Sequence, residues 1–208
     1  MKSRLFTLIA GCAIGMANLS FGQTPVYSGE AAVAKVNVLG VLNASIEGTG
    51  QLPPDGGSLS TELASLNVPT LLDLHLLSAG TNGQNNETDS AASVTQVSLT
   101  AAGVHITASV LTSNAAATCA GAVTGTSTVV GLKVNGLSVR ITGAPNQTVP
   151  LLVGSLVINE QISSVVNTPS STVADMLVNA LHLRVLALAD VAISSSHAAV
   201  SCASGVPH

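Results

Sequence analysis

From Val33 onward, apolar and polar residues alternate along most of the chain. Val, Leu, Ile, Thr and Ala dominate the alternating segments, and Gly, Asn and Pro separate one segment from the next. A period of two is typical of a strand with one buried face. Many such strands joined by short connections predict an all-β domain. We expect an antiparallel two-sheet sandwich, with a β-helix or β-roll as the alternative.

Turn residues place the connections between these strands. Asn135-Gly136 separates two alternating segments and predicts a hairpin with a type I′ turn, in which both residues adopt positive φ. The alternation also changes phase around Gly103, which indicates a bulge or a tight turn. Residues 187–190 are expected to turn the chain into a last strand that leads to Cys202.

Three segments are expected to differ from simple short strands. Residues 36–46 are predicted to form one long strand region. Leucines recur at helical spacing after Ser58, which predicts one short helix over residues 60–66. Residues 80–89 contain no apolar residue and are expected to form a polar loop.

The N-terminus has the pattern of a targeting segment. Basic residues precede the apolar run Leu5–Met16, and Ser20-Phe21-Gly22 offers small residues for a cleavage site. This pattern predicts a secretory signal peptide over residues 1–22 and a single extracytoplasmic domain over residues 23–208. The alternative is a lipoprotein that is anchored through a lipid on Cys12.

Cleavage of the signal peptide leaves two cysteines, Cys119 and Cys202. An even pair of cysteines in an exported protein predicts a disulfide bond, and two buried free thiols are the alternative. No Cys-x-x-Cys motif and no cluster of Cys and His is present. We therefore expect neither a metal ion nor a cofactor.

Charge and aromatic content exclude several classes of function. The chain has six Lys and Arg against ten Asp and Glu, and 1% of its residues are aromatic. Loss of Lys2 and Arg4 with the signal peptide leaves four basic and ten acidic residues, a net charge of −6. Nucleic-acid partners need a basic surface, and sugar or single-strand sites need aromatic faces for stacking, so we expect neither partner. No apolar stretch after the signal peptide is long enough for a transmembrane helix.

Several short motifs follow one another in a distinctive order. They include Val36-x-x-Leu39-Gly40, Val104-x-Ile106-x-Ala108, Val134-Asn135-Gly136, Ala144-Pro145-Asn146, Asn159-Glu160-Gln161, Val178-Asn179-Ala180-Leu181-His182-Leu183 and Asp190-Val191-x-Ile193 before Cys202. Over about residues 30–202, the chain resembles the choice-of-anchor P family of bacterial exported proteins. The resemblance implies export, a surface or extracellular location and a bridge between the two cysteines. It implies no particular activity.

Glu160 is the first of two candidates for hydrolytic chemistry. It lies between Asn159 and Gln161 inside a predicted strand. A general acid or base at this position needs a carboxylate or a His nearby. The simpler interpretation is a polar triplet that pairs with or caps strand backbone at an edge.

His197 is the second candidate. A Ser, Asp190 and His197 could form a nucleophilic triad, although the chain has no Gly-x-Ser-x-Gly segment. His182 lies between two leucines and is expected on the solvent-facing side of its strand, in a cross-strand contact.

Taken together, these patterns favour a non-enzymatic exported β-domain. We expect a structural or interaction module of the bacterial cell envelope or extracellular space, with an unidentified protein or envelope component as its partner. One alternative is an extracytoplasmic hydrolase that uses Glu160 or His197. Another is a surface protein that self-assembles through sheet edges, which low charge and long Val, Thr and Ala strands favour.

Overall fold

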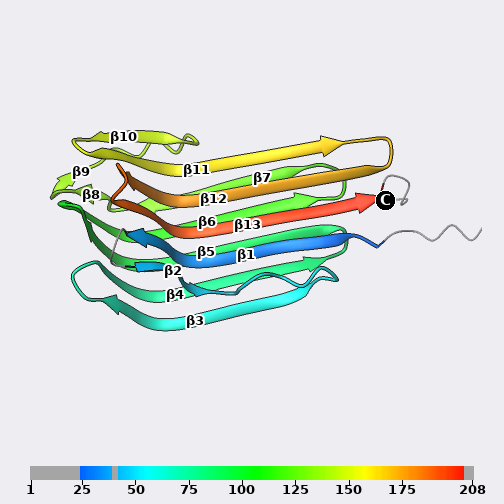
Figure 1. Ribbon diagram of the computed structural model, residues 1–208, viewed down its shortest axis with the longest axis horizontal. Coiled ribbons are helices and arrows are strands. Elements are labelled where there is room, and N and C mark those ends of the chain that lie inside the picture. The colour runs from blue at the N-terminus through cyan, green and yellow to red at the C-terminus, as the bar shows by residue number, and fades with distance from the viewer. Residues whose placement is uncertain (1–23, 39–41, 204–208) are drawn as a thin grey trace, which may run out of the picture.

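The computed structural model describes residues 24–38 and 42–203. Within these residues the chain forms two antiparallel sheets that pack face to face (Figure 1). The predicted all-β sandwich is confirmed, and the alternative of a β-helix or β-roll is wrong, because all the paired strands are antiparallel. The predicted signal peptide and Cys12 lie outside the described residues. No helix in the described part of the chain is long and apolar enough to cross a membrane.

The first sheet, sheet A, has the strand order β10-β11-β12-β13-β1-β2. Its strands are β1 (Val26–Val38), β2 (Leu42–Gly48), β10 (Gln147–Leu151), β11 (Gly154–Asn167), β12 (Ser171–Val185) and β13 (Ala189–Ala203). The single long strand region expected over residues 36–46 is wrong. The chain reverses within this region, because β1 and β2 pair antiparallel with Val38 opposite Leu42.

The second sheet, sheet B, has the order β3-β4-β5-β6-β8-β9, and β7 also pairs with β6. Its strands are β3 (Gly57–Val68), β4 (Leu72–Gln84), β5 (Glu87–Ala101), β6 (Val104–Thr118), β7 (Val123–Val130), β8 (Lys133–Val134) and β9 (Leu137–Ser138). The Asn135-Gly136 hairpin is confirmed between β8 and β9, with φ of 50° and 80°. The phase change at Gly103 is the tight turn between β5 and β6.

A transverse row of irregular residues interrupts the long strands, at the level where they bend in Figure 1. Regular pairing skips a residue there, and Leu76, Gln96, Asn159 and Ser194 adopt φ between 45° and 55°, a region that residues other than glycine rarely occupy. We call this row the kink row. It contains Glu47, Val33, Ser194, Ala180 and Asn159 in sheet A, and Ala64, Leu76, Gln96 and Ser109 in sheet B.

The inward-facing positions of a strand change parity where it crosses the kink row. In β12, Met176 and Val178 pack into one core cluster before Ala180, whereas Leu181 and Leu183 pack into the other cluster after it. A residue with a left-handed backbone turns the following side chain to the opposite face. The smaller core cluster lies wholly on one side of the kink row, whereas the larger cluster extends across it and includes Leu77, Val94 and Leu111.

The kink row explains why the short helix expected over residues 60–66 is wrong. These residues belong to β3, and Leu59 and Leu66 pack against different core clusters. Their positions differ in parity because β3 crosses the kink row at Ala64. The change of face leaves inward leucines at a spacing that resembles the period of a helix.

The polar loop expected over residues 80–89 is also wrong. β4 continues to Gln84 and β5 starts at Glu87, so only a tight turn separates the two strands. Thr88 is fully buried in this segment, and its hydroxyl donates a hydrogen bond of 2.9 Å to the carbonyl of Ala199 in sheet A. A buried hydroxyl that is hydrogen-bonded can replace an apolar side chain in the interior.

A group of buried hydroxyls lies between the two sheets, and all of them except Thr81 hydrogen-bond from one sheet to the other. We call the group the hydroxyl belt, which consists of Thr81, Thr88, Ser90, Ser113, Ser194 and Ser196. Ser90 donates to the carbonyl of His197 at 2.6 Å, and Gly29 faces Thr81 with no space for a Cβ atom. The sheets therefore pack closely in the middle of the sandwich, and direct hydrogen bonds connect them there.

The predicted disulfide between Cys119 and Cys202 is present. It links the end of β6 in sheet B to the end of β13 in sheet A, with the two Cα atoms 5.5 Å apart. Both cysteines are buried in the smaller core cluster. The bond thus fixes the two sheets to one another at the end of the sandwich where that cluster lies.

Candidate functional site

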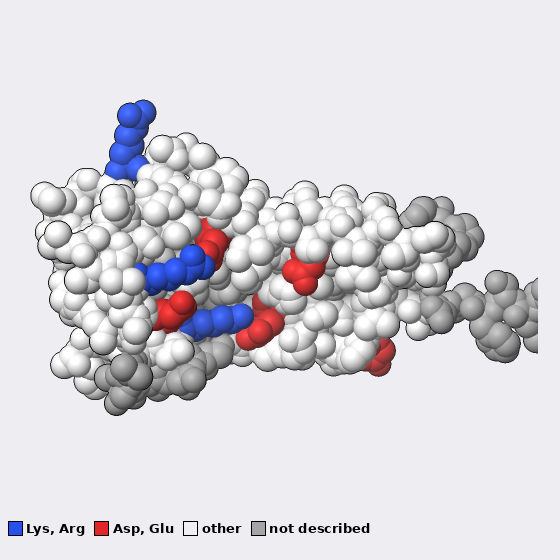
Figure 2. Space-filling view, turned by 45° about the horizontal axis from the view of Figure 1, so that its top comes forward, with Lys and Arg blue, Asp and Glu red and all other residues white. Residues whose placement is uncertain are grey.

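The outer face of sheet A gathers charged side chains of both signs (Figure 2). Its ionisable residues are Glu30, Lys35, Glu160, Asp175, His182, Arg184, Asp190 and His197. Only 8% of the chain is charged, so this concentration is the most distinctive chemical feature of the surface. It includes both residues that the sequence singles out for hydrolytic chemistry.

Glu160 in β11 is the centre of a compact group that we call the charged network: Glu160, Asn179, His182, Arg184 and Asp190. The Glu160 carboxylate accepts hydrogen bonds from Nδ2 of Asn179 at 2.7 Å and from Nη2 of Arg184 at 2.6 Å. Nδ1 of His182 lies 2.6 Å from the same oxygen that Asn179 contacts. With 5% of its surface exposed, Glu160 is buried, and three donor groups from β12 surround its two oxygens.

His182 connects Glu160 to a second carboxylate. Its Nε2 lies 2.8 Å from Oδ1 of Asp190 at the start of β13. Glu160, His182 and Asp190 belong to β11, β12 and β13 in turn. The charged network therefore ties three adjacent strands together.

The surroundings of Glu160 set its protonation state. Burial by itself raises the pKa of Glu160, but hydrogen bonds from Asn179 and His182 and the charges of His182 and Arg184 outweigh it. The pKa of Glu160 therefore lies below its ordinary value of 4.5. An ionised carboxylate held by three donors is poorly suited to give or take a proton in a reaction. This arrangement suits a structural ion network better than a general acid or base.

The kink row determines which side chains reach Glu160. Asn179 and His182 differ by an odd number of positions, so a regular strand would place them on opposite faces. Because β12 changes parity at Ala180, both residues lie on the outer face of sheet A. The left-handed backbone of Asn159 makes the matching change in β11. Apolar and polar alternation alone does not reveal these two changes of parity, so it could not predict that Asn179 and His182 both reach Glu160.

The expected positions of two residues need correction. His182 lies on the predicted face and makes the predicted cross-strand contacts, but it is not solvent-exposed, because the charged network leaves only 8% of it accessible. Glu160 does not cap strand backbone at an edge, because its carboxylate contacts side chains of β12. Both residues take part in one network.

His197 lies outside the charged network. Its Nε2 is 3.2 Å from Oδ2 of Asp175, whereas Asp190 contacts His182. The hydroxyls of Ser194 and Ser196 point into the sandwich and donate to backbone carbonyls of sheet B at 2.9 and 3.1 Å. The structure does not bring a serine, Asp190 and His197 together as a triad.

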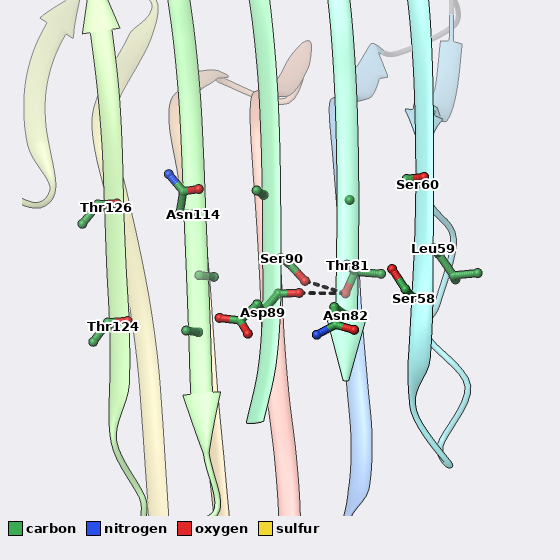
Figure 3. Close-up of a pocket in the computed structure, with 14 residues that line it drawn as sticks. Ser58, Leu59, Ser60, Thr81, Asn82, Asp89, Ser90, Asn114, Thr124 and Thr126 are labelled. Carbon is green, nitrogen blue, oxygen red and sulfur yellow. Dashed lines mark hydrogen bonds between the residues drawn. The ribbon is translucent and has the colours of Figure 1, made fainter. Parts of the chain in front are cut away.

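Two surface cavities lie near polar groups. One, of about 450 Å³, adjoins the charged network and is lined by Arg184, Asp190, Asn37 and the turn over residues 185–189. The other is a groove of about 440 Å³ on the outer face of sheet B, lined by hydroxyl and amide side chains and Asp89 (Figure 3). Burial raises the pKa of Asp89. Within the described ranges, no group of three or more His, Cys, Asp or Glu is placed to hold a metal ion.

Comparison with known proteins adds no relative. No protein-family model, curated protein or solved structure matches the chain. The geometry of the outer faces and edges is therefore the basis for a functional proposal.

Proposed function

We propose that this protein is an exported, non-enzymatic β-domain that serves as a structural or interaction module of the bacterial cell envelope or extracellular space. The observation that carries the proposal is the charged network around Glu160. The two carboxylate oxygens of Glu160 are already occupied by contacts with Asn179, His182 and Arg184. Such a network stabilises a sheet and leaves little capacity for acid–base chemistry.

Two further observations support the extracytoplasmic location. Disulfide bonds persist mainly in oxidising compartments, which suits the bond between Cys119 and Cys202. The signal-peptide pattern and the resemblance to the choice-of-anchor P family favour the same location. In this proposal the protein is secreted, and attachment through a lipid on Cys12 is the alternative.

Fractionation of a bacterium that expresses the full chain tests the location. We expect the protein outside the cytoplasm, with residues 1–22 removed and with a mass two hydrogens below that of the reduced chain. A mass that includes lipid on Cys12 would support the anchored form. A reduced, unprocessed protein in the cytoplasm would overturn the proposed location.

An activity assay tests the non-enzymatic part of the proposal. The purified protein is incubated with chromogenic ester, peptide and glycoside substrates beside the Glu160→Gln and His197→Ala variants. We expect no turnover above that of buffer for any of the three proteins. Turnover that either substitution abolishes would instead support a hydrolase that uses that residue.

A further inference from the structure

The edge of β11 that faces away from β12 is paired with β10 at the start of the strand and is unpaired at its end. β10 pairs with β11 only from Gly154 to Ile158, and within the described residues no strand pairs on that side from Ile162 to Asn167. Figure 1 shows the second half of β11 as the outermost strand of its sheet. We call Ile162–Asn167 the open edge. Unpaired backbone groups at such an edge are a template for pairing with another chain.

The side chain of Asn146 marks where the open edge begins. Its Oδ1 accepts a 2.9 Å hydrogen bond from the N–H of Gln161, and its Nδ2 donates to the carbonyl of Gln161 at 3.3 Å. The backbone groups of Gln161 therefore point away from β12. Because this direction alternates along an antiparallel strand, Ser163, Val165 and Asn167 also point their N–H and C=O groups away from β12.

The side chains of the open edge are uncovered on both faces of the strand. Ile162 is 52% exposed, Val165 is 40% exposed and Val166 is 51% exposed. Val173 of β12 lies opposite Val166 and is 39% exposed, which extends the apolar surface inward from the edge. Apolar side chains beside unpaired backbone fit a partner that adds a strand.

The charge pattern indicates that this partner is a second copy of the chain. The open edge contains no charged residue and no proline, so two copies can pair without repulsion and without loss of a backbone donor. The edge strand β3 of sheet B differs, because Glu62 lies near its middle and would approach the Glu62 of a second copy. Charges on edge strands oppose this kind of pairing.

We propose that two copies of the protein pair antiparallel through their open edges, about a two-fold axis at Val165. This register uses all three residues with outward backbone groups. Val165 lies opposite Val165 of the second copy, and Ser163 lies opposite Asn167. Each of these pairs exchanges two backbone hydrogen bonds. The two copies of sheet A then form one continuous sheet. The inference deepens the proposed function by naming a second copy as the partner.

Substitutions at the two-fold axis test the pairing. Sedimentation of the purified protein over micromolar to millimolar concentrations should show a monomer–dimer equilibrium. Val165→Lys places like charges opposite one another and should raise the dissociation constant at least about tenfold. Leu63→Lys in β3 is the matched control, because Leu63 is 37% exposed on an edge strand of sheet B, and this variant should dimerise like the wild type.

Cysteine cross-linking gives a second readout that does not depend on a charged variant. Opposed residues in a hydrogen-bonded antiparallel pair have Cα atoms about 5.5 Å apart, a spacing that suits a disulfide. Val165→Cys should therefore form a covalent dimer under mild oxidation, and Leu63→Cys should not. A wild-type protein that stays monomeric at millimolar concentration would overturn the pairing, as would equal cross-linking of the two cysteine variants. A monomer that is still exported and oxidised would leave the proposed function standing.

Discussion

The two halves of β11 have similar side chains but different surroundings. Ile158 in the first half is 1% exposed, whereas Ile162 in the second half is 52% exposed. The first half lies between β10 and β12 and supplies Glu160 to the charged network, and the second half has only β12 beside it. The hydrophobicity of a side chain in β11 therefore does not decide whether that side chain is buried. Ile158 packs into the core between the sheets, whereas the change of face at Asn159 turns Ile162 to the outer face of sheet A, beyond the end of β10.

The disulfide holds the end of the sandwich at which the open edge lies. Replacing both Cys119 and Cys202 with Ser should lower the free energy of unfolding by about 4–5 kcal/mol, because the bond closes a long loop in the unfolded chain. Chemical denaturation measures this loss. Hydrogen exchange should show that β12 amides near Ser171 lose more protection than those near Val185. Equal losses at both ends would contradict the local role of the bond.

Truncation of one apolar side chain in each half of β11 compares the halves directly. Leu156 is fully buried, so Leu156→Ala should lower the free energy of unfolding by about 3 kcal/mol. Ile162→Ala should cost less than about 1 kcal/mol, because much of the side chain is already in water. Urea unfolding under conditions that keep the protein monomeric measures both variants. Similar losses would mean that the second half is covered in solution.

The charged network should contribute less than the apolar core. Glu160→Gln leaves His182 and Arg184 without their shared carboxylate and should cost about 2 kcal/mol, less than for a fully buried pair, because Arg184 is partly exposed. Glu62→Gln on the exposed surface of β3 is the control and should change stability by less than about 0.5 kcal/mol. Equal effects of the two substitutions would show that the network does not stabilise the fold.

The stability difference between the wild type and Glu160→Gln should depend on pH. The pKa of Glu160 is lower in the folded protein than in the unfolded chain, so its contribution is complete above the ordinary value of 4.5. That contribution is lost as the pH falls through the lowered pKa of the folded state. The difference in stability between the wild type and Glu160→Gln should therefore shrink below pH 4.5. A difference that grows with acid would contradict the lowered pKa.

Asn146 contacts β11 at the boundary between its two halves. Of the substitutions compared, one at Asn146 should have the smallest effect on the free energy of unfolding. It has a φ of 58°, which glycine adopts without strain, so Asn146→Gly removes only the side chain and its two bonds to Gln161. The stability should fall by about 0.5–1 kcal/mol, and the amide of Gln161 should exchange faster. Asn85→Gly, at another position with positive φ, should leave the exchange of Gln161 unchanged.

Local sequence patterns correctly predicted those structural features that depend on residues close together in the sequence. Alternation predicted strands, and Asn135-Gly136 predicted its hairpin, because a type I′ turn needs positive φ at both positions. The pairing of Cys119 with Cys202 followed from their being the two cysteines that lie after the predicted signal peptide. Glu160 stood out as an acid inside a strand and His182 was expected in a cross-strand contact, but the sequence did not pair the two residues with each other. Each success relied on a signal within a short segment or on a simple count.

The kink row accounts for the main errors. It made β3 resemble a helix around residues 60–66, and it brought Asn179 and His182 to one face of β12. Its left-handed residues Leu76, Gln96 and Ser194 have side chains that give no local sign of positive φ in the middle of a strand. Their conformation follows from alignment with the same irregularity in the strands on either side.

The sequence by itself determined that this chain forms an antiparallel β-sandwich with one disulfide, because alternation, turn residues and cysteine count are local or additive properties. Only the tertiary structure decided which residues meet across strands and which strand edge stays open. Glu160 has its partners because β11 and β12 change face at the same level. The backbone of Val165 is unpaired on one side because β10 ends before it. Both outcomes depend on strand order and register, which arise from contacts between segments far apart in the chain.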